Sequence, residues 1–186
     1  MLQSLLTKPP IIHLAFFHGI GVSQLALQYL NVNIIKTFPW EIDPFCNELL
    51  DHRYHQQIEH MGDATQTDFT TFCRQLSDNY DNSHVILITS APPCKDHSRV
   101  RDAPPGVSGS DGSLIQRMTN IDLTIRQQLP TYTIRSLMDN VLPHHDIQEQ
   151  FRDISTQWTS SQDRHLSHYI GHSKTDTTSS TILSHR

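Results

Sequence analysis

The sequence predicts an α/β fold built around a parallel β-sheet, and three observations support this prediction. Residues 85–88 (VILI) are an unbroken apolar run, as expected of a strand covered on both faces, and residues 11–17 (IIHLAFF) are a second apolar run of strand length. The first run breaks into a glycine turn at residues 18–21, and apolar residues at helical spacing follow over residues 23–30. A strand, a turn and a helix in this order are typical of the unit from which parallel sheets are built.

Segments of strand and helix pattern alternate along the rest of the chain. We expect further strands over residues 34–40, 58–61 and 132–138, and helices over residues 44–50, 68–76, 114–129 and 146–158. Pro44 suits the first turn of its helix, and Asp43 is expected to cap that helix. Pro92 and Pro93 end the central strand, because proline has no backbone N–H to donate to a ladder.

Length and composition favour one folded domain flanked by terminal segments outside it. The chain has 186 residues, and 36% of them are hydrophobic, which is low for a globular protein. We expect residues 1–10 to form a lead-in and residues 11–158 to form the folded region. Residues 159–186 are rich in Ser, Thr, His and Asp, and a segment with so little to bury is expected to be disordered.

Charge and cysteine content narrow the class of protein. The net charge of −5 lacks the strongly basic character of many nucleic-acid-binding domains, so any contact with a polyanion must rest on a local patch. Three cysteines argue against a disulfide framework and for a reducing compartment. The sequence shows neither a signal-peptide pattern nor an apolar run of membrane-spanning length. We therefore expect an intracellular protein that binds no membrane, and a nuclear one if its source is eukaryotic.

Three features point to a site at the carboxyl edge of the predicted sheet. Gly19 and Gly21 would let the backbone approach a ligand at the start of a helix, where free N–H groups lie. Glu41 follows a predicted strand 20 residues after Gly21, and an acidic residue at this spacing commonly binds ribose hydroxyls. Cys94 lies just beyond the central strand, at the edge where open α/β sheets bind ligands. We interpret Cys94 as a nucleophile.

Together these segments resemble the C5-cytosine DNA methyltransferase family, in wording closest to its eukaryotic de novo branch. Residues 17–21 (FHGIG) are similar to the family's F-x-G-x-G motif, and the resemblance covers residues 11–158 in the family's motif order. It implies that S-adenosyl-L-methionine is the cofactor, with Glu41 on its ribose and Asp63 on its adenine amino group. The residues implied in cofactor binding are Phe17, Gly19, Gly21, Glu41, Asp63 and Pro93.

The resemblance also implies a catalytic set. Pro93-Cys94, with Ser98 four residues on, resembles the family's nucleophile motif, and Asp139-Asn140-Val141 stands where the family has Glu-Asn-Val. The implied partner is DNA, from which a cytosine is flipped out. A cysteine thiolate adds to carbon 6 of this base, and carbon 5 then attacks the methyl group of the cofactor.

The remaining implied roles concern charge and positioning. Asp139 is the implied acid beside ring nitrogen 3, and Asn140 would hold that strand end in place. Arg99 and Arg101 would bind phosphates of the DNA backbone. The glycine-rich segment 106–113 resembles the mobile loop that follows the nucleophile in the family.

The implied fold is a Rossmann-like S-adenosylmethionine-dependent methyltransferase fold, incomplete at its C-terminal end. Nothing after Trp158 resembles the family's basic Q-x-R-x-R motif, its target-recognition region or its final motif. Asp139 is also one methylene shorter than the family's glutamate, and about 1 Å of lost reach can slow a reaction roughly 100-fold. Two functions therefore stand side by side: a DNA (cytosine-5-)-methyltransferase, and a catalytically impaired module that partners a complete methyltransferase subunit.

Other interpretations of the same residues remain open. The glycines could form an ordinary turn, whereas a dinucleotide-binding motif fits less well because Gln24 stands at its third glycine position. Cys94 alone would more often be a buried structural thiol. A phosphatase-like Cys-x5-Arg loop fails, because Val100 occupies the arginine position. Cysteine and histidine spacings form no four-ligand set, so we expect no metal site.

Overall fold

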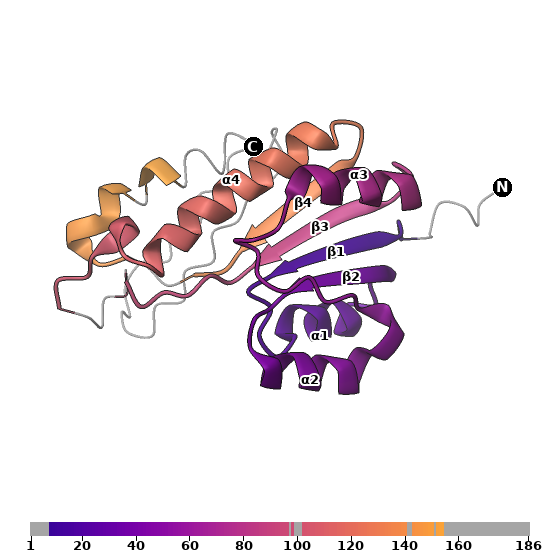
Figure 1. The fold of residues 1–186 in the computed structure, drawn as a ribbon, viewed down its shortest axis with the longest axis horizontal. Coiled ribbons are helices and arrows are strands. Elements are labelled where there is room, and N and C mark those ends of the chain that lie inside the picture. The colour runs from indigo at the N-terminus through magenta and orange to yellow at the C-terminus, as the bar shows by residue number, and fades with distance from the viewer. Residues whose placement is uncertain (1–7, 97, 99–101, 141–142, 151, 155–186) are drawn as a thin grey trace.

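The computed structural model describes residues 8–96, 98, 102–140, 143–150 and 152–154, and they form an α/β fold with one parallel sheet (Figure 1). The strands are β1 (Ile11–Phe16), β2 (Ile34–Trp40), β3 (Val85–Ser90) and β4 (Thr133–Met138). The α-helices are α1 (Val22–Tyr29), α2 (Pro44–Tyr54), α3 (Phe69–Asn79) and α4 (Gly112–Gln128), and the 3-10 helices are η2 (His55–Gln57), η3 (Gly106–Ser108) and η4 (His145–Ile147). Residues 148–150 and 152–154 are also helical.

The strand order is β2-β1-β3-β4, and each neighbouring pair is parallel. The predicted strand over residues 58–61 is reduced to a single parallel bridge between Ile58 and Thr37. The amides of Glu59 and Met61 still donate to carbonyls of β2. Pro39 has no backbone N–H to donate to this segment, so the ladder of hydrogen bonds with β2 cannot continue. When residues 58–61 are counted as an outer neighbour of β2, the order along the sheet is that of a Rossmann-like α/β fold. The predicted fold class is confirmed.

Helices cover the two faces of the sheet unequally. Figure 1 shows α3 and α4 on one face and α1 and α2 on the other. The main core lies on the α3 and α4 face, and its members come from all four strands and both helices. Asp43 caps α2 as predicted, since its carboxylate accepts the N–H groups of Phe45 and Cys46. None of the helices in the described part of the chain is long and apolar enough to cross a membrane.

Trp40 is the largest fully buried side chain of the core. Its ring stacks on Phe16 with a centroid distance of 4.3 Å, and its Nε1 donates to Thr67 Oγ1 at 2.9 Å. Replacing Trp40 by Ala should lower the free energy of unfolding by about 3 to 5 kcal/mol, because it leaves a cavity between β2 and α3. Urea denaturation measures this loss, and Phe45→Ala is the control, since Phe45 is 70% exposed.

The opposite face is polar where α1 covers it. His13, Thr37 and Thr89 are buried there, with His13 Nε2 at 2.8 Å from Thr89 Oγ1. Thr89 Oγ1 in turn donates to Ser23 of α1 at 3.3 Å. The one buried residue of α1 is Gln24, whereas its large apolar side chains face outward. The helix was correctly predicted, but its apolar stripe does not pack on the sheet, because the sheet offers polar partners here.

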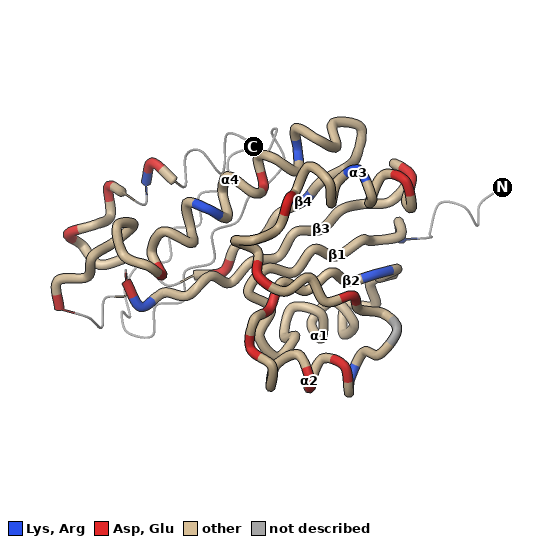
Figure 2. Tube along the Cα trace, in the orientation of Figure 1, with Lys and Arg blue, Asp and Glu red and all other residues tan. Residues whose placement is uncertain are grey.

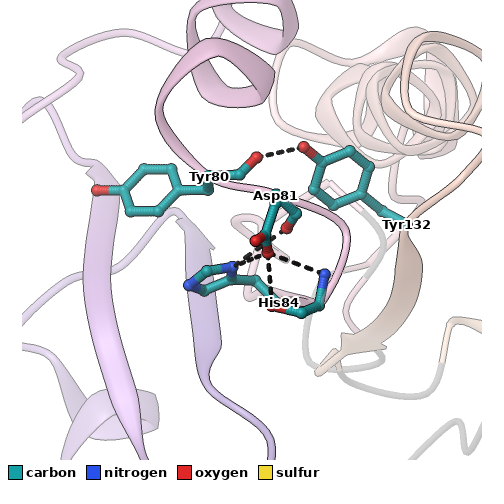
Figure 3. Close-up of polar contacts among 5 residues, drawn as sticks. Tyr80, Asp81, His84 and Tyr132 are labelled. Atoms are coloured by element: carbon teal, nitrogen blue, oxygen red, sulfur yellow. Dashed lines mark hydrogen bonds and ion pairs between the residues drawn. The ribbon is translucent and has the colours of Figure 1, made fainter.

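The turn between α3 and β3 is closed by side chains from two parts of the chain (Figure 3). The Asp81 carboxylate accepts the N–H of Ser83 at 3.0 Å and lies 3.0 Å from His84 Nδ1. The hydrogen bond from the Ser83 hydroxyl, together with those from the Ser83 N–H and from His84, lowers the pKa of Asp81. Tyr132 donates its hydroxyl proton to the carbonyl of Tyr80, which ties the turn to the start of β4. The contacts fix where β3 begins and therefore where the segment carrying Cys94 leaves the sheet.

Candidate functional site

The predicted site residues lie where the four parallel strands end. Parallel strands present their carboxyl ends at one edge of the sheet, so residues distant in sequence meet there. The turn at 17–21 follows β1, Glu41 follows β2, Pro93 and Cys94 follow β3, and Asp139 follows β4.

The turn after β1 depends on left-handed backbone. The φ angles of Phe17, Gly19 and Gly21 are 53°, 54° and 83°. A Cβ atom on Gly21 would lie 2.7 Å from Leu50 Cδ2, so only glycine lets α1 pack against α2 at this point. At Gly19, by contrast, no heavy atom of the described residues lies within 4 Å of where a Cβ would stand. The backbone at Gly19 is therefore open to a ligand.

Glu41 holds this turn to the end of β2. Its Oε2 accepts the N–H of Gly19 at 2.6 Å, and its Oε1 accepts the N–H groups of Ile42 and Asp43 at 2.9 Å each. Three backbone donors fix the orientation of the carboxylate. Each carboxylate oxygen can accept about two hydrogen bonds, so Oε2 can still accept one from a hydroxyl group of a ligand.

A pocket of about 420 Å³ brings together four of the residues predicted to bind the cofactor. These residues are Phe17, Glu41, Asp63 and Pro93. Asp63 follows Gly62, which has a φ of 70°, and its Oδ1 accepts the N–H of Thr65 at 2.7 Å. The four side chains come from four separate segments of the chain, so their convergence on one pocket is a result of the fold.

A second pocket of about 550 Å³ lies beside the first and shares Phe17 and Ala91 with it. Gly19 and Asp139 both line this pocket. Ser90 lines it too, and its buried Oγ has no hydrogen-bond partner among the described residues. A buried hydroxyl without a partner is costly unless a water or a ligand satisfies it.

The Asp and Glu side chains that line the two pockets make them negatively charged. Glu41, Asp63 and Asp111 line the first pocket and Asp139 lines the second, whereas no described Lys or Arg lines either. Figure 2 shows acidic residues in red gathered where the strands end beside α2. A cavity lined by carboxylates attracts cations and repels phosphates. The pair of pockets is therefore suited to a cationic ligand.

Cys94 lies next to this pair of pockets without lining either of them. The residue is half-buried, one position beyond Pro93, and its carbonyl accepts the N–H of Ser98 at 2.9 Å. Asn140 donates from Nδ2 to the carbonyl of Pro92 at 3.3 Å, which ties the end of β4 to the segment that carries Cys94. The two predicted DNA-binding arginines, Arg99 and Arg101, lie outside the described residues.

The other two cysteines differ from Cys94 in their surroundings. Cys73 belongs to the main core, and burial raises the pKa of its thiol to about 12. Such a thiol is inert as a nucleophile at neutral pH. Cys46 is half-buried on α2, where burial and the charges of Asp43 and Glu41 raise the pKa of its thiol. All three cysteines carry free thiols.

Asp96 is a residue of this region that the sequence did not reveal. Its buried carboxylate accepts the N–H groups of Asp111 and Gly112 at 2.8 and 3.3 Å, at the start of α4. Its carbonyl accepts the N–H of Gly106 at 2.7 Å. The segment likened to a mobile loop is therefore packed against Asp96. Sequence spacing gave no signal, because the partners lie 10 to 16 residues away.

Comparisons with known proteins find similarity among solved structures. Neither the protein-family models nor the curated proteins include a match to the chain. Among solved structures, the chain is similar to the crystal structure of the S. pombe Dnmt2 methyltransferase, with 19% sequence identity and a TM-score of 0.40. The similarity covers 78% of this chain and 39% of that one. The chain thus spans about two fifths of the length of the protein it resembles.

Proposed function

We propose that this chain binds S-adenosyl-L-methionine and methylates carbon 5 of cytosine in DNA. The observation that carries the proposal is the convergence of Phe17, Glu41, Asp63 and Pro93 on one pocket. Each was assigned to the cofactor from its own motif, and the motifs are up to 76 residues apart in the sequence. They meet at the edge of the sheet where open α/β folds bind ligands, as a cofactor site requires.

The chemistry of the lining fits this cofactor. S-adenosyl-L-methionine carries a positive sulfonium and a positive ammonium group, and the pockets present four carboxylates. A dinucleotide would bring phosphates to the same carboxylates, which disfavours that alternative. Glu41 would accept hydrogen bonds from the ribose hydroxyls, and Asp63 would accept one from the adenine amino group. When bound, the cofactor supplies an electrophilic methyl group.

The residues around Cys94 have the roles of nucleophile and acid in this proposal. The Cys94 sulfur bonds to carbon 6 of a flipped-out cytosine, and the ring electrons move to carbon 5. Asp139, in the neighbouring pocket, acts at ring nitrogen 3 once it has taken up a proton: the protonated carboxyl group then donates a hydrogen bond where negative charge develops. Carbon 5 would take the methyl group and release S-adenosylhomocysteine; it would then lose its proton to a base, and the carbon–sulfur bond would break to restore the thiolate. Asn140 holds the segment of Pro92 in place through its hydrogen bond.

The test is covalent trapping of DNA. The full chain, S-adenosyl-L-methionine and a duplex containing 5-fluorocytosine should give an adduct that survives a denaturing gel, because fluorine at carbon 5 prevents release. Cys94→Ser should abolish the adduct, and Cys46→Ser should retain it, since Cys46 is also half-buried. The absence of any adduct with the unaltered chain would contradict the enzymatic proposal.

Lengthening the acid gives a second, independent readout. Asp139→Glu should raise the rate of adduct formation roughly 10- to 100-fold, because the added methylene restores about 1 Å of reach toward the base. Asp78→Glu, a change at an exposed residue of α3 that lines neither pocket, is the control and should leave the rate within about twofold. Rate constants come from gels sampled over time. An unchanged rate in Asp139→Glu would show that the shorter acid does not limit the reaction.

The alternative function is a non-catalytic partner of a complete methyltransferase subunit. Two observations favour it: Cys94 lines neither pocket, and Asp139 is shorter than the acid it replaces. Calorimetry with S-adenosylhomocysteine separates the two functions. Tight binding by the isolated chain together with DNA trapping supports the enzyme, whereas weak binding that a partner subunit strengthens supports the module.

A further inference from the structure

Two histidines and an aspartate converge on the loop that follows β4. Asp146 Oδ1 lies 3.0 Å from His145 Nε2, and Asp146 Oδ2 lies 3.5 Å from His144 Nδ1. The two imidazole rings are 4.1 Å apart between centroids. One carboxylate is thus approached by two imidazoles, and the three donor atoms all lie within 4.8 Å of one another.

These separations are close to those of a bound metal ion. Zinc–nitrogen and zinc–oxygen bonds of about 2.0 to 2.2 Å at tetrahedral angles place donor atoms about 3.4 Å apart. The two nitrogen–oxygen separations, 3.0 and 3.5 Å, are close to this value, and the two histidine nitrogens lie within 4.8 Å of each other. We propose that His144, His145 and Asp146 bind a divalent transition-metal ion, with zinc as the expected ion.

The donor set argues for this class of ion. Imidazole nitrogen suits zinc, copper and nickel, whereas calcium and magnesium take oxygen ligands. Two imidazoles and one carboxylate leave a fourth position for water or another ligand. The His144 side chain is 15% exposed, so one wall of the site is already desolvated and oriented.

The position of the loop gives the site a structural consequence. Pro143, the residue before the cluster, forms an antiparallel bridge with Ser98, and Asn140 donates to the carbonyl of Pro92. Asn140 and Pro143, which precede the metal-binding cluster, therefore contact the segment that carries Cys94 before and after that cysteine. A bound ion would hold this segment more firmly, and it would do so whether or not the proposed methyltransferase function is correct.

Zinc titration of the full chain tests the proposal. The protein is freed of metal with a chelator and titrated with zinc chloride in a calorimeter at pH 7.5. The unaltered chain should bind one ion tightly. The double variant His144→Gln/His145→Gln should bind it at least tenfold more weakly, and Asp146→Asn should also weaken binding.

The chain offers a matched control in two histidine–aspartate pairs that have a single imidazole each. His60 lies 2.8 Å from Asp51, and His84 lies 3.0 Å from Asp81. The variant His60→Gln/His84→Gln should keep the affinity of the unaltered chain. Zinc should also raise the melting temperature of the unaltered chain and the control but not of His144→Gln/His145→Gln. Equal affinity in the two double variants, or no tight binding by the unaltered chain, would overturn the proposal.

Discussion

Lowering the pH from 7.5 to 4.5 is expected to remove on the order of 5 kcal/mol from the free energy of unfolding, through two buried histidines. Burial, together with the charge of His18, lowers the pKa of His13 to about 3. Burial lowers the pKa of His18 to about 4, although Gln24 and the Glu41 carboxylate act in the opposite direction and His60 adds to the lowering. Both rings belong to the polar layer beneath α1, with 5.7 Å between their centroids.

The direction of the effect follows from where each state binds protons. Above pH 6.5, the usual histidine value, both rings are neutral in the folded and the unfolded chain, and the stability they allow is fully present. Between pH 6.5 and about 4, the unfolded chain binds protons that the folded chain excludes. Stability is therefore lost as the pH falls through this range. Below the folded pKa values of about 4 and 3 the loss stops growing.

Urea denaturation at pH 7.5, 6.5, 5.5 and 4.5 measures this loss. His13→Gln should be less stable at pH 7.5 but should lose only about half as much stability on acidification, because one of the two titrating groups is gone. His52→Gln is the control, since His52 is exposed, and should follow the unaltered chain. Hydrogen bonds lower the pKa of Asp68 and of Asp81, so both also lose stability as the pH falls, but they do so equally in His13→Gln, in His52→Gln and in the unaltered chain. An unaltered pH slope in His13→Gln would contradict the assignment.

Much of the fold could be predicted because its signals are local. The run at residues 34–40 became β2 with the same bounds, and Asp43 and Pro44 began α2 as their side chains require. The pocket lined by the predicted cofactor-binding residues could be anticipated for a related reason. The end of a parallel strand is readable in sequence, and the fold brings all such ends to one edge. Glu41 and Asp63 therefore met at one pocket without any long-range signal in the chain.

What could not be predicted depends on contacts between distant residues. The outward apolar side of α1 follows from His13 and Thr89, which make the facing surface of the sheet polar. The strand predicted over residues 58–61 is only a single bridge because of Pro39, which lies in the correctly predicted strand β2. The role of Asp96 is of the same kind, since nothing near it in sequence distinguishes it from a surface carboxylate.

Asp96 performs the work of a helix cap from a distant segment. The position that would normally cap α4 is Asp111, and its side chain makes no capping hydrogen bond. The Asp96 carboxylate replaces it, and its negative charge lies at the positive end of the helix. The site is tightly packed, since a Cβ atom on Gly109 would lie 2.2 Å from Asp96 Oδ2. Asp96 is two residues beyond Cys94, so the same contacts anchor the segment that carries Cys94 to α4.

Removing this carboxylate should destabilise the fold strongly. Asp96→Ala is expected to lower the free energy of unfolding by about 2 to 4 kcal/mol, because two buried N–H groups lose their acceptor. Asp43→Ala is the matched control, since that carboxylate also accepts two N–H groups but is exposed, and water replaces it at a smaller loss. Urea denaturation gives both values, and hydrogen exchange should quicken at Asp111 and Gly112 in Asp96→Ala alone. Equal losses in the two variants would mean that α4 does not depend on Asp96.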